Sequence, residues 1–170
     1  LGFSSKNLDD IDIGLSETAL NIIGYPLHDK QNPKSIVDGQ FSMPFCAAVA
    51  IEDGGLTWDD YKIHLENKET ISLCNRIKVS PDKDAEDCCP EFMSAKVKVV
   101  VDGVKYEKFV KIPKGEPDNF MKDSEFISKF KGLTEPYLSS KRINQLTDLM
   151  LRMDSVNTVN SIFELSQVDL

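Results

Sequence analysis

A β-hairpin in the second half of the sequence most limits what this chain can fold into. Between Ala95 and Val101, valines alternate with lysines, which is the two-residue period of a strand. The dipeptide Asp102-Gly103 follows and favours the two-residue turn that joins antiparallel strands. A returning strand from Lys105 to Ile112 completes the motif. An isolated hairpin is marginally stable, so the sequence predicts further strands and helices packed against it.

Two more strands are predicted upstream of the hairpin. From Leu8 to Ser16, isoleucines and a leucine at every second position alternate with Asp12 and Gly14. A shorter alternation runs from Arg76 to Ser80 and ends at a proline. Together with the hairpin, these segments predict a four-stranded, mainly antiparallel sheet.

The segment from Val37 to Ile51 is strongly apolar and rich in alanine, so it favours a buried helix. Pro44 suits a first helical turn, and Gly54-Gly55 is a typical stop. We interpret Pro26 to Ser35 and Asp82 to Pro90 as loops. Further helices are predicted after a Thr57 cap through Ile63, at Lys68–Asn75, Glu125–Lys131, Ser139–Met153 and Val159–Leu165. The fold class is therefore α+β, with several helices around the sheet.

Length and charge narrow the functional classes. The chain has 170 residues, enough for one domain spanning 1–170. Its 20 basic and 28 acidic residues give a formal net charge of -8, which argues against nucleic-acid binding and against docking on an anionic membrane. An acidic ligand would need a few local cations.

Metal and disulfide chemistry are not favoured by the cysteine and histidine pattern. The four cysteines are Cys46, Cys74, Cys88 and Cys89, and they have no C-x-x-C spacing. Neither His28 nor His64 pairs with them at zinc-ligand spacing. We therefore expect free thiols in a reducing cytoplasm and no metal site.

Several segments, in order, resemble the C-terminal domain of the MmgE/PrpD family. These are the strand at Leu8–Ile13, the Phe-Ser signature within Asp38–Phe45, the Asp53-Gly54-Gly55 stop, the strand Ile77–Val79 with Asp84, the Asp102-Gly103 turn, the Pro113–Pro117 stretch, and Lys129-Phe130. The resemblance covers about Leu8 to Leu151.

The resemblance implies a lid on a cofactor-independent lyase similar to 2-methylcitrate dehydratase. Family members also include cis-aconitate decarboxylase and iminodisuccinate epimerase, which share proton abstraction beside a carboxylate or imine carbon. In the family an all-helical N-terminal domain carries most of the acid and base residues, and the sequence here does not contain it. We therefore interpret the chain as part of a longer, homodimeric protein acting on a di- or tricarboxylate. The alternative is a stand-alone binding module.

Three residues are candidates for contact with a substrate. Ser42 would either hold a carboxylate at a helix start or cap the buried helix, and the two roles are compatible. Phe41 precedes it in the signature. Tyr25 would either donate to a carboxylate or relay a proton, against the simpler interpretation of a packing side chain.

The remaining chemically capable residues have simpler interpretations. His28 and His64 are expected at the surface without partners, and Cys46 in the core. Cys88 and Cys89 lie beside acidic residues, which disfavours a thiolate. Lys111 and Lys114 would steer anions or simply be solvated. The leucines and methionines of the last long helix are expected to be core.

Overall fold

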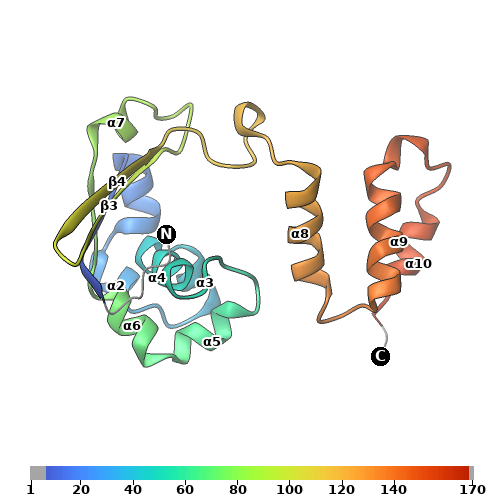
Figure 1. Cartoon of the computed structure of the whole chain (residues 1–170), viewed down its shortest axis with the longest axis horizontal. Coiled ribbons are helices and arrows are strands. Elements are labelled where there is room, and N and C mark those ends of the chain that lie inside the picture. The colour runs from blue at the N-terminus through green and yellow to red at the C-terminus, as the bar shows by residue number, and fades with distance from the viewer. Residues whose placement is uncertain (1–6, 169–170) are drawn as a thin grey trace. The chain divides into compact units, whose positions relative to one another are not determined.

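A computed structural model describes residues 7–168 of the chain (Figure 1). These residues form two compact units, one ending at Asn119 and the other beginning at Phe120. The first unit contains the sheet and the candidate site. The second is entirely helical in its regular structure.

The first unit is built on a four-stranded sheet in the order β2-β1-β3-β4. Its strands are β1 (Leu8–Leu15), β2 (Ile77–Pro81), β3 (Ala95–Val101) and β4 (Val104–Val110). The β1–β3 and β3–β4 pairs are antiparallel, which confirms the mainly antiparallel α+β prediction. The sheet is nevertheless mixed, because β2 lies parallel to β1. The long helical connection between these two strands lets the chain return in the same direction.

The predicted hairpin is confirmed, with its turn at Asp102 and Gly103. Both residues have positive φ, 48° at Asp102 and 76° at Gly103, as a primed two-residue turn requires. Only one end of the hairpin is buried. Val101 is buried, but Val97 is exposed and β4 is exposed along its whole length.

Helices between β1 and β2 cover one face of the sheet (Figure 1). Side chains from both layers, including Ile11, Ile77, Phe45 and Val49, form one apolar core. Removing these side chains from water is the main stabilising contribution of this layer. The segments are α1 (Glu17–Ala19), the π-helix η2 (Leu20–Gly24), α2 (Leu27–Gln31), α3 (Ile36–Gln40), α4 (Met43–Asp53), α5 (Asp60–Glu66) and α6 (Lys68–Cys74).

The apolar segment predicted as one helix is two helices joined at Phe41 and Ser42. Ser42 is extended and begins α4 as its N-cap, with Pro44 in the first turn. Gly54 ends α4 in the left-handed conformation, at φ 77°, as the glycine pair predicted.

Two segments interpreted as loops contain short helices, and one predicted cap is displaced. The Pro26–Ser35 segment includes α2, and the acidic segment after β2 includes α7 (Lys83–Glu86). The Asp82 carboxylate caps α7 by accepting from the backbone N–H groups of Asp84 and Ala85, at 3.0 and 3.2 Å. Helix α5 begins at Asp60, with Asp59 rather than Thr57 at its N-cap.

Asp82 also joins α7 to the sheet. Its carboxylate lies 3.1 Å from Lys96 Nζ and 4.0 Å from Lys98 Nζ, both on β3. Burial raises the pKa of Asp82, but the hydrogen bond from Lys96 and the α7 backbone N–H groups outweigh it, so the net pKa lies below the usual value. Asp82 packs directly over Gly14 of β1.

The second unit contains α8 (Asp123–Thr134), α9 (Ser140–Leu151), the 3-10 turn η4 (Met153–Ser155) and α10 (Asn160–Leu165). Ile143 and Leu146 on α9 are buried as predicted. Met150 and Met153 are exposed, so the prediction that they belong to a core was wrong. Across residues 7–168, the structure contains no helix with the length and apolar character needed to span a bilayer.

Candidate functional site

Ser42, the leading sequence candidate, lies beneath the surface at the start of α4. Its side chain is only 1% exposed. The hydroxyl oxygen accepts from the Phe45 backbone N–H at 3.0 Å, and the hydroxyl donates to the Lys30 carbonyl oxygen at 2.5 Å. The capping role is therefore observed directly. The same two bonds tie α4 to the end of α2.

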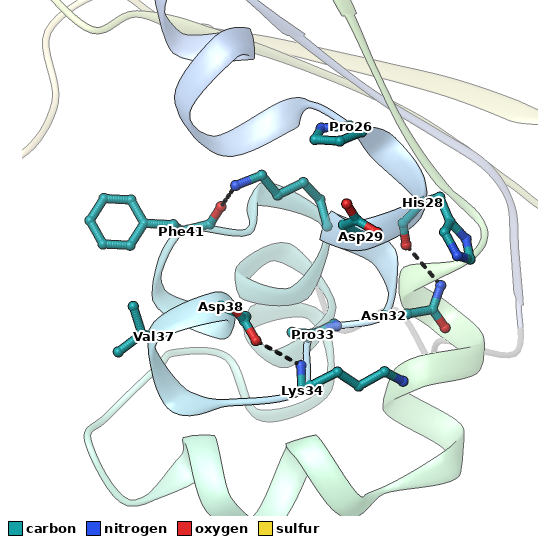
Figure 2. A pocket seen from close by; sticks show the side chains of 10 residues that line it. Pro26, His28, Asp29, Asn32, Pro33, Lys34, Val37, Asp38 and Phe41 are labelled. Atoms are coloured by element: carbon teal, nitrogen blue, oxygen red, sulfur yellow. Dashed lines mark hydrogen bonds between the residues drawn. The ribbon is translucent and has the colours of Figure 1, made fainter.

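A pocket of about 520 Å³ opens beside this junction, between α2, α3 and the turn at Phe41. Figure 2 shows Phe41 and Val37 on one side of it and His28 and Asn32 on the other. The lining is therefore amphipathic, with an apolar wall facing a polar one. Such a mixed lining suits a small organic molecule that carries a charged group.

Lys30 supplies the most constrained charge in this pocket. Its ammonium donates to the Ile22 carbonyl oxygen at 2.8 Å and to the Phe41 carbonyl oxygen at 2.7 Å. These acceptors lie in η2 and at the C-cap of α3, so the lysine bridges three helical segments. An ammonium carries three N–H donors, and these two bonds use two of them.

The acidic lining groups differ in how they are held. The Asp38 carboxylate accepts from the Lys34 backbone N–H at 3.1 Å (Figure 2). A hydrogen bond with the Ser35 side chain, followed by the Lys34 N–H, keeps the pKa of Asp38 below its usual value. Asp29 is exposed in the middle of α2. Two lysines and two aspartates thus balance the formal charge of the lining.

The other sequence candidates lie around this pocket or away from it. Tyr25 is exposed and directly precedes Pro26, which lines the pocket. His28 is exposed, as expected. Cys46 is half-buried on α4, where its thiol donates to the Gly39 carbonyl oxygen at 3.3 Å and burial raises its pKa. Cys88 and Cys89 are half-buried, and the exposed Lys111 has its ammonium 5.9 Å from the centre of the Phe92 ring.

His64 corrects the expectation of a solvated histidine without a partner. It is buried, with 4% exposure, because it follows Tyr61 by one helical turn on the inward face of α5. Its Nε2 lies 2.9 Å from Asp53 Oδ2 and its Nδ1 lies 2.7 Å from Thr70 Oγ1. That Tyr61–His64 spacing was the sequence signal for burial. The two carboxylates near it, Asp53 and Glu52, end α4 and were not recognised as partners.

Hydrogen bonds around His64 link side chains from three helices. The Thr70 hydroxyl donates its only proton to Glu52 Oε2, at 2.6 Å. Thr70 Oγ1 and Asp53 Oδ2 lie within hydrogen-bond distance of the two ring nitrogens of His64. Glu52 Oε2 is also 3.4 Å from Nδ1. The cluster therefore joins α4, α5 and α6 through hydrogen bonds.

Fold and pocket define an α+β domain with a pocket in its helical layer rather than at the sheet. The chain belongs to the MmgE/PrpD family, because the C-terminal domain of that family matches residues 1–153. The matched range includes the whole sheet, the pocket, α8 and α9. No curated protein matches the chain.

Replacing Ser42 with alanine should lower the free energy of unfolding by about 1–2 kcal/mol, because both a buried cap and the bond to Lys30 are lost. Ser35 caps the short helix α3 through the Asp38 N–H in an exposed position, so Ser35→Ala is the matched control. We expect Ser35→Ala to lower the free energy of unfolding by less than half as much as Ser42→Ala. Urea unfolding followed by Trp58 fluorescence measures both variants. Equal losses of stability would contradict the importance of the buried junction.

Proposed function

We propose that this chain is the C-terminal lid domain of a cofactor-independent lyase similar to 2-methylcitrate dehydratase. The observation that carries the proposal is the family match over residues 1–153. In this proposal a base on a preceding helical domain removes a proton from the carbon next to a carboxylate, and the hydroxyl leaves as water. The chain by itself then lacks the main acid and base groups.

The pocket beside Phe41 is proposed to face the substrate. Phe41 is half exposed at its mouth, while Ser42 lies below and holds the turn in place. Ser42 would then act on the substrate by positioning Phe41 and Lys30, since its hydroxyl already makes two bonds within the domain. Tyr25 remains a possible proton donor in the proposal, at the edge formed by Pro26.

Related activities are alternatives within the same chemistry. A cis-aconitate decarboxylase or an iminodisuccinate epimerase would use the same fold around a different di- or tricarboxylate. The proposal further includes a homodimer, a cytoplasmic location, and no metal or organic cofactor. A stand-alone, non-catalytic binding module is the alternative from a different class.

A turnover assay tests the proposal. The longer protein, with its helical domain, should convert at least one of 2-methylcitrate, cis-aconitate and iminodisuccinate, while the 170-residue chain alone should convert none. Product formation is followed by ¹H NMR in buffer treated with a chelator. If the longer protein leaves all three acids unchanged, the lyase proposal is wrong. If the 170-residue chain alone converts any of the three acids, the assignment of the acid and base groups to another domain is wrong.

A further inference from the structure

We propose that the pocket beside Phe41 binds one carboxylate of a small aliphatic acid through the remaining N–H of the Lys30 ammonium. This inference rests on the proposed function and deepens it, because it names the group on the lid that contacts the substrate. It also assigns a role to a lysine that no sequence motif had identified.

The position of Lys30 is the first argument. Carbonyl oxygens of Ile22 and Phe41 accept two of its protons, at 2.8 and 2.7 Å, and hold the ammonium at the pocket lining. Within the described residues these are the polar partners of Nζ, so the third N–H is available to a ligand. A lysine already held in place loses less side-chain entropy when a carboxylate binds than a solvated lysine does.

The apolar wall is the second argument. Val37 and Phe41 are exposed apolar side chains on one side of the pocket (Figure 2), and the Lys30 ammonium bonds to the Phe41 carbonyl oxygen on that side. A short hydrocarbon segment would cover them while its carboxylate reaches Lys30. The pocket volume of about 520 Å³ accommodates a molecule of this size.

Charge decides the orientation of the ligand. Asp29 and Asp38 lie in the same lining and repel a carboxylate from their side. The positive charge of Lys34 offsets one of these two negative charges, so the lining has no strong net electrostatic field. Binding then depends on the direct charge-assisted hydrogen bond from Lys30 and not on long-range attraction, which the net charge of -8 would oppose.

The test uses the 170-residue chain and tricarballylate, a tricarboxylate without the hydroxyl group that a dehydratase eliminates. Titration followed by ¹H–¹⁵N NMR should shift the amides of residues 26–41 in a saturable way. Lys30→Gln should raise Kd at least about tenfold, as expected for loss of a hydrogen bond to a charged group. Lys78→Gln is the matched control, because Lys78 is an exposed lysine paired with Asp10 on the sheet.

A second pair of variants avoids the bonds that Lys30 makes within the fold. Val37→Asp places a carboxylate in the apolar wall, while Ile63→Asp makes the same change on α5 outside the pocket lining, at matching exposures of 61% and 62%. We expect the first to raise Kd at least about fivefold by like-charge repulsion and the second to leave it unchanged. This pair decides the matter if Lys30→Gln fails to fold.

Several results would overturn the inference. They are the absence of saturable shifts, shifts centred outside residues 26–41, or equal effects of the two members of either pair. If the 170-residue chain binds tricarballylate but the longer protein converts none of the three acids, only the lyase proposal is wrong. If the longer protein converts an acid but the pocket binds no ligand, only the role proposed for Lys30 is wrong.

Discussion

Replacing His64 with leucine should lower the free energy of unfolding by about 3 kcal/mol, because it removes the central partner from a buried hydrogen-bonded cluster that contains two carboxylates. Leucine has a similar volume but leaves Thr70 and Glu52 facing an apolar side chain. Thr70 is fully buried, and the Glu52 side chain is only 16% exposed. The loss arises from the hydrogen bond that Thr70 Oγ1 no longer makes with the ring, and from the Glu52 carboxylate facing an apolar group, rather than from a cavity.

His28→Leu is the matched control for this substitution. His28 is exposed on α2, so the same change there should alter the free energy of unfolding by less than about 0.5 kcal/mol. Trp58 is the single tryptophan, and its ring centre lies 6.1 Å from that of Tyr61 on α5. Its fluorescence in urea therefore reports on the unit that contains both histidines. Equal effects of the two substitutions would show that the His64 cluster does not stabilise the fold.

A double-mutant cycle with Thr70 sharpens this test. If the bonds around His64 form one network, Thr70→Val should cost less in the His64→Leu background than in the native chain. We expect a coupling free energy of about 1 kcal/mol or more for groups joined in this way. Additive effects would mean that the two side chains stabilise the helices independently.

Replacing Gly14 with alanine should lower the free energy of unfolding by about 2–3 kcal/mol, because the added methyl group overpacks a rigid contact. The new Cβ would lie 2.6 Å from Asp82 Cβ, well inside van der Waals contact. Either β1 or Asp82 must move. If Asp82 moves, both the α7 cap and the ion pair with Lys96 are disturbed.

Gly55→Ala is the control, because a Cβ at Gly55 meets no atom within 4 Å. This substitution should leave the free energy of unfolding unchanged or raise it by up to about 1 kcal/mol, because alanine restricts the unfolded chain more than glycine does. The clash involves the Cβ of Asp82. In the Gly14→Ala background, a second substitution Asp82→Gly should therefore relieve the clash, whereas Asp82→Ala should not. Trp58 fluorescence in urea again measures each variant. A Gly14→Ala variant as stable as Gly55→Ala would show that β1 and α7 separate easily.

Local sequence predicted the hairpin and the buried helix well, for reasons of short-range geometry. Asp102-Gly103 tolerates the positive φ values that the turn needs. Gly54 ends α4 for the same reason. The exposure of Val97 was not predictable in this way, because period-two alternation identifies a face of a strand but not whether a helix covers it.

Pairings between segments distant in the sequence could not be predicted from local sequence patterns. The parallel β1–β2 pair joins Ile11 to Ile77 across the intervening helices, and no turn motif specifies it. The same is true of His64, whose partners Asp53 and Thr70 come from neighbouring helices. Its burial was inferable from the Tyr61 spacing on α5, but its hydrogen bonds were not.

The amino-acid sequence by itself determined the α+β class, the hairpin turn, the cap at Ser42 and the family resemblance, because each depends on neighbouring residues or on the order of short motifs. Tertiary structure alone decided the parallel strand, the His64 cluster, the close contact of Gly14 with Asp82, and the bridge that Lys30 makes to Ile22 and Phe41. These features depend on groups far apart in the chain, whose approach is set by packing of the whole core and not by any local preference.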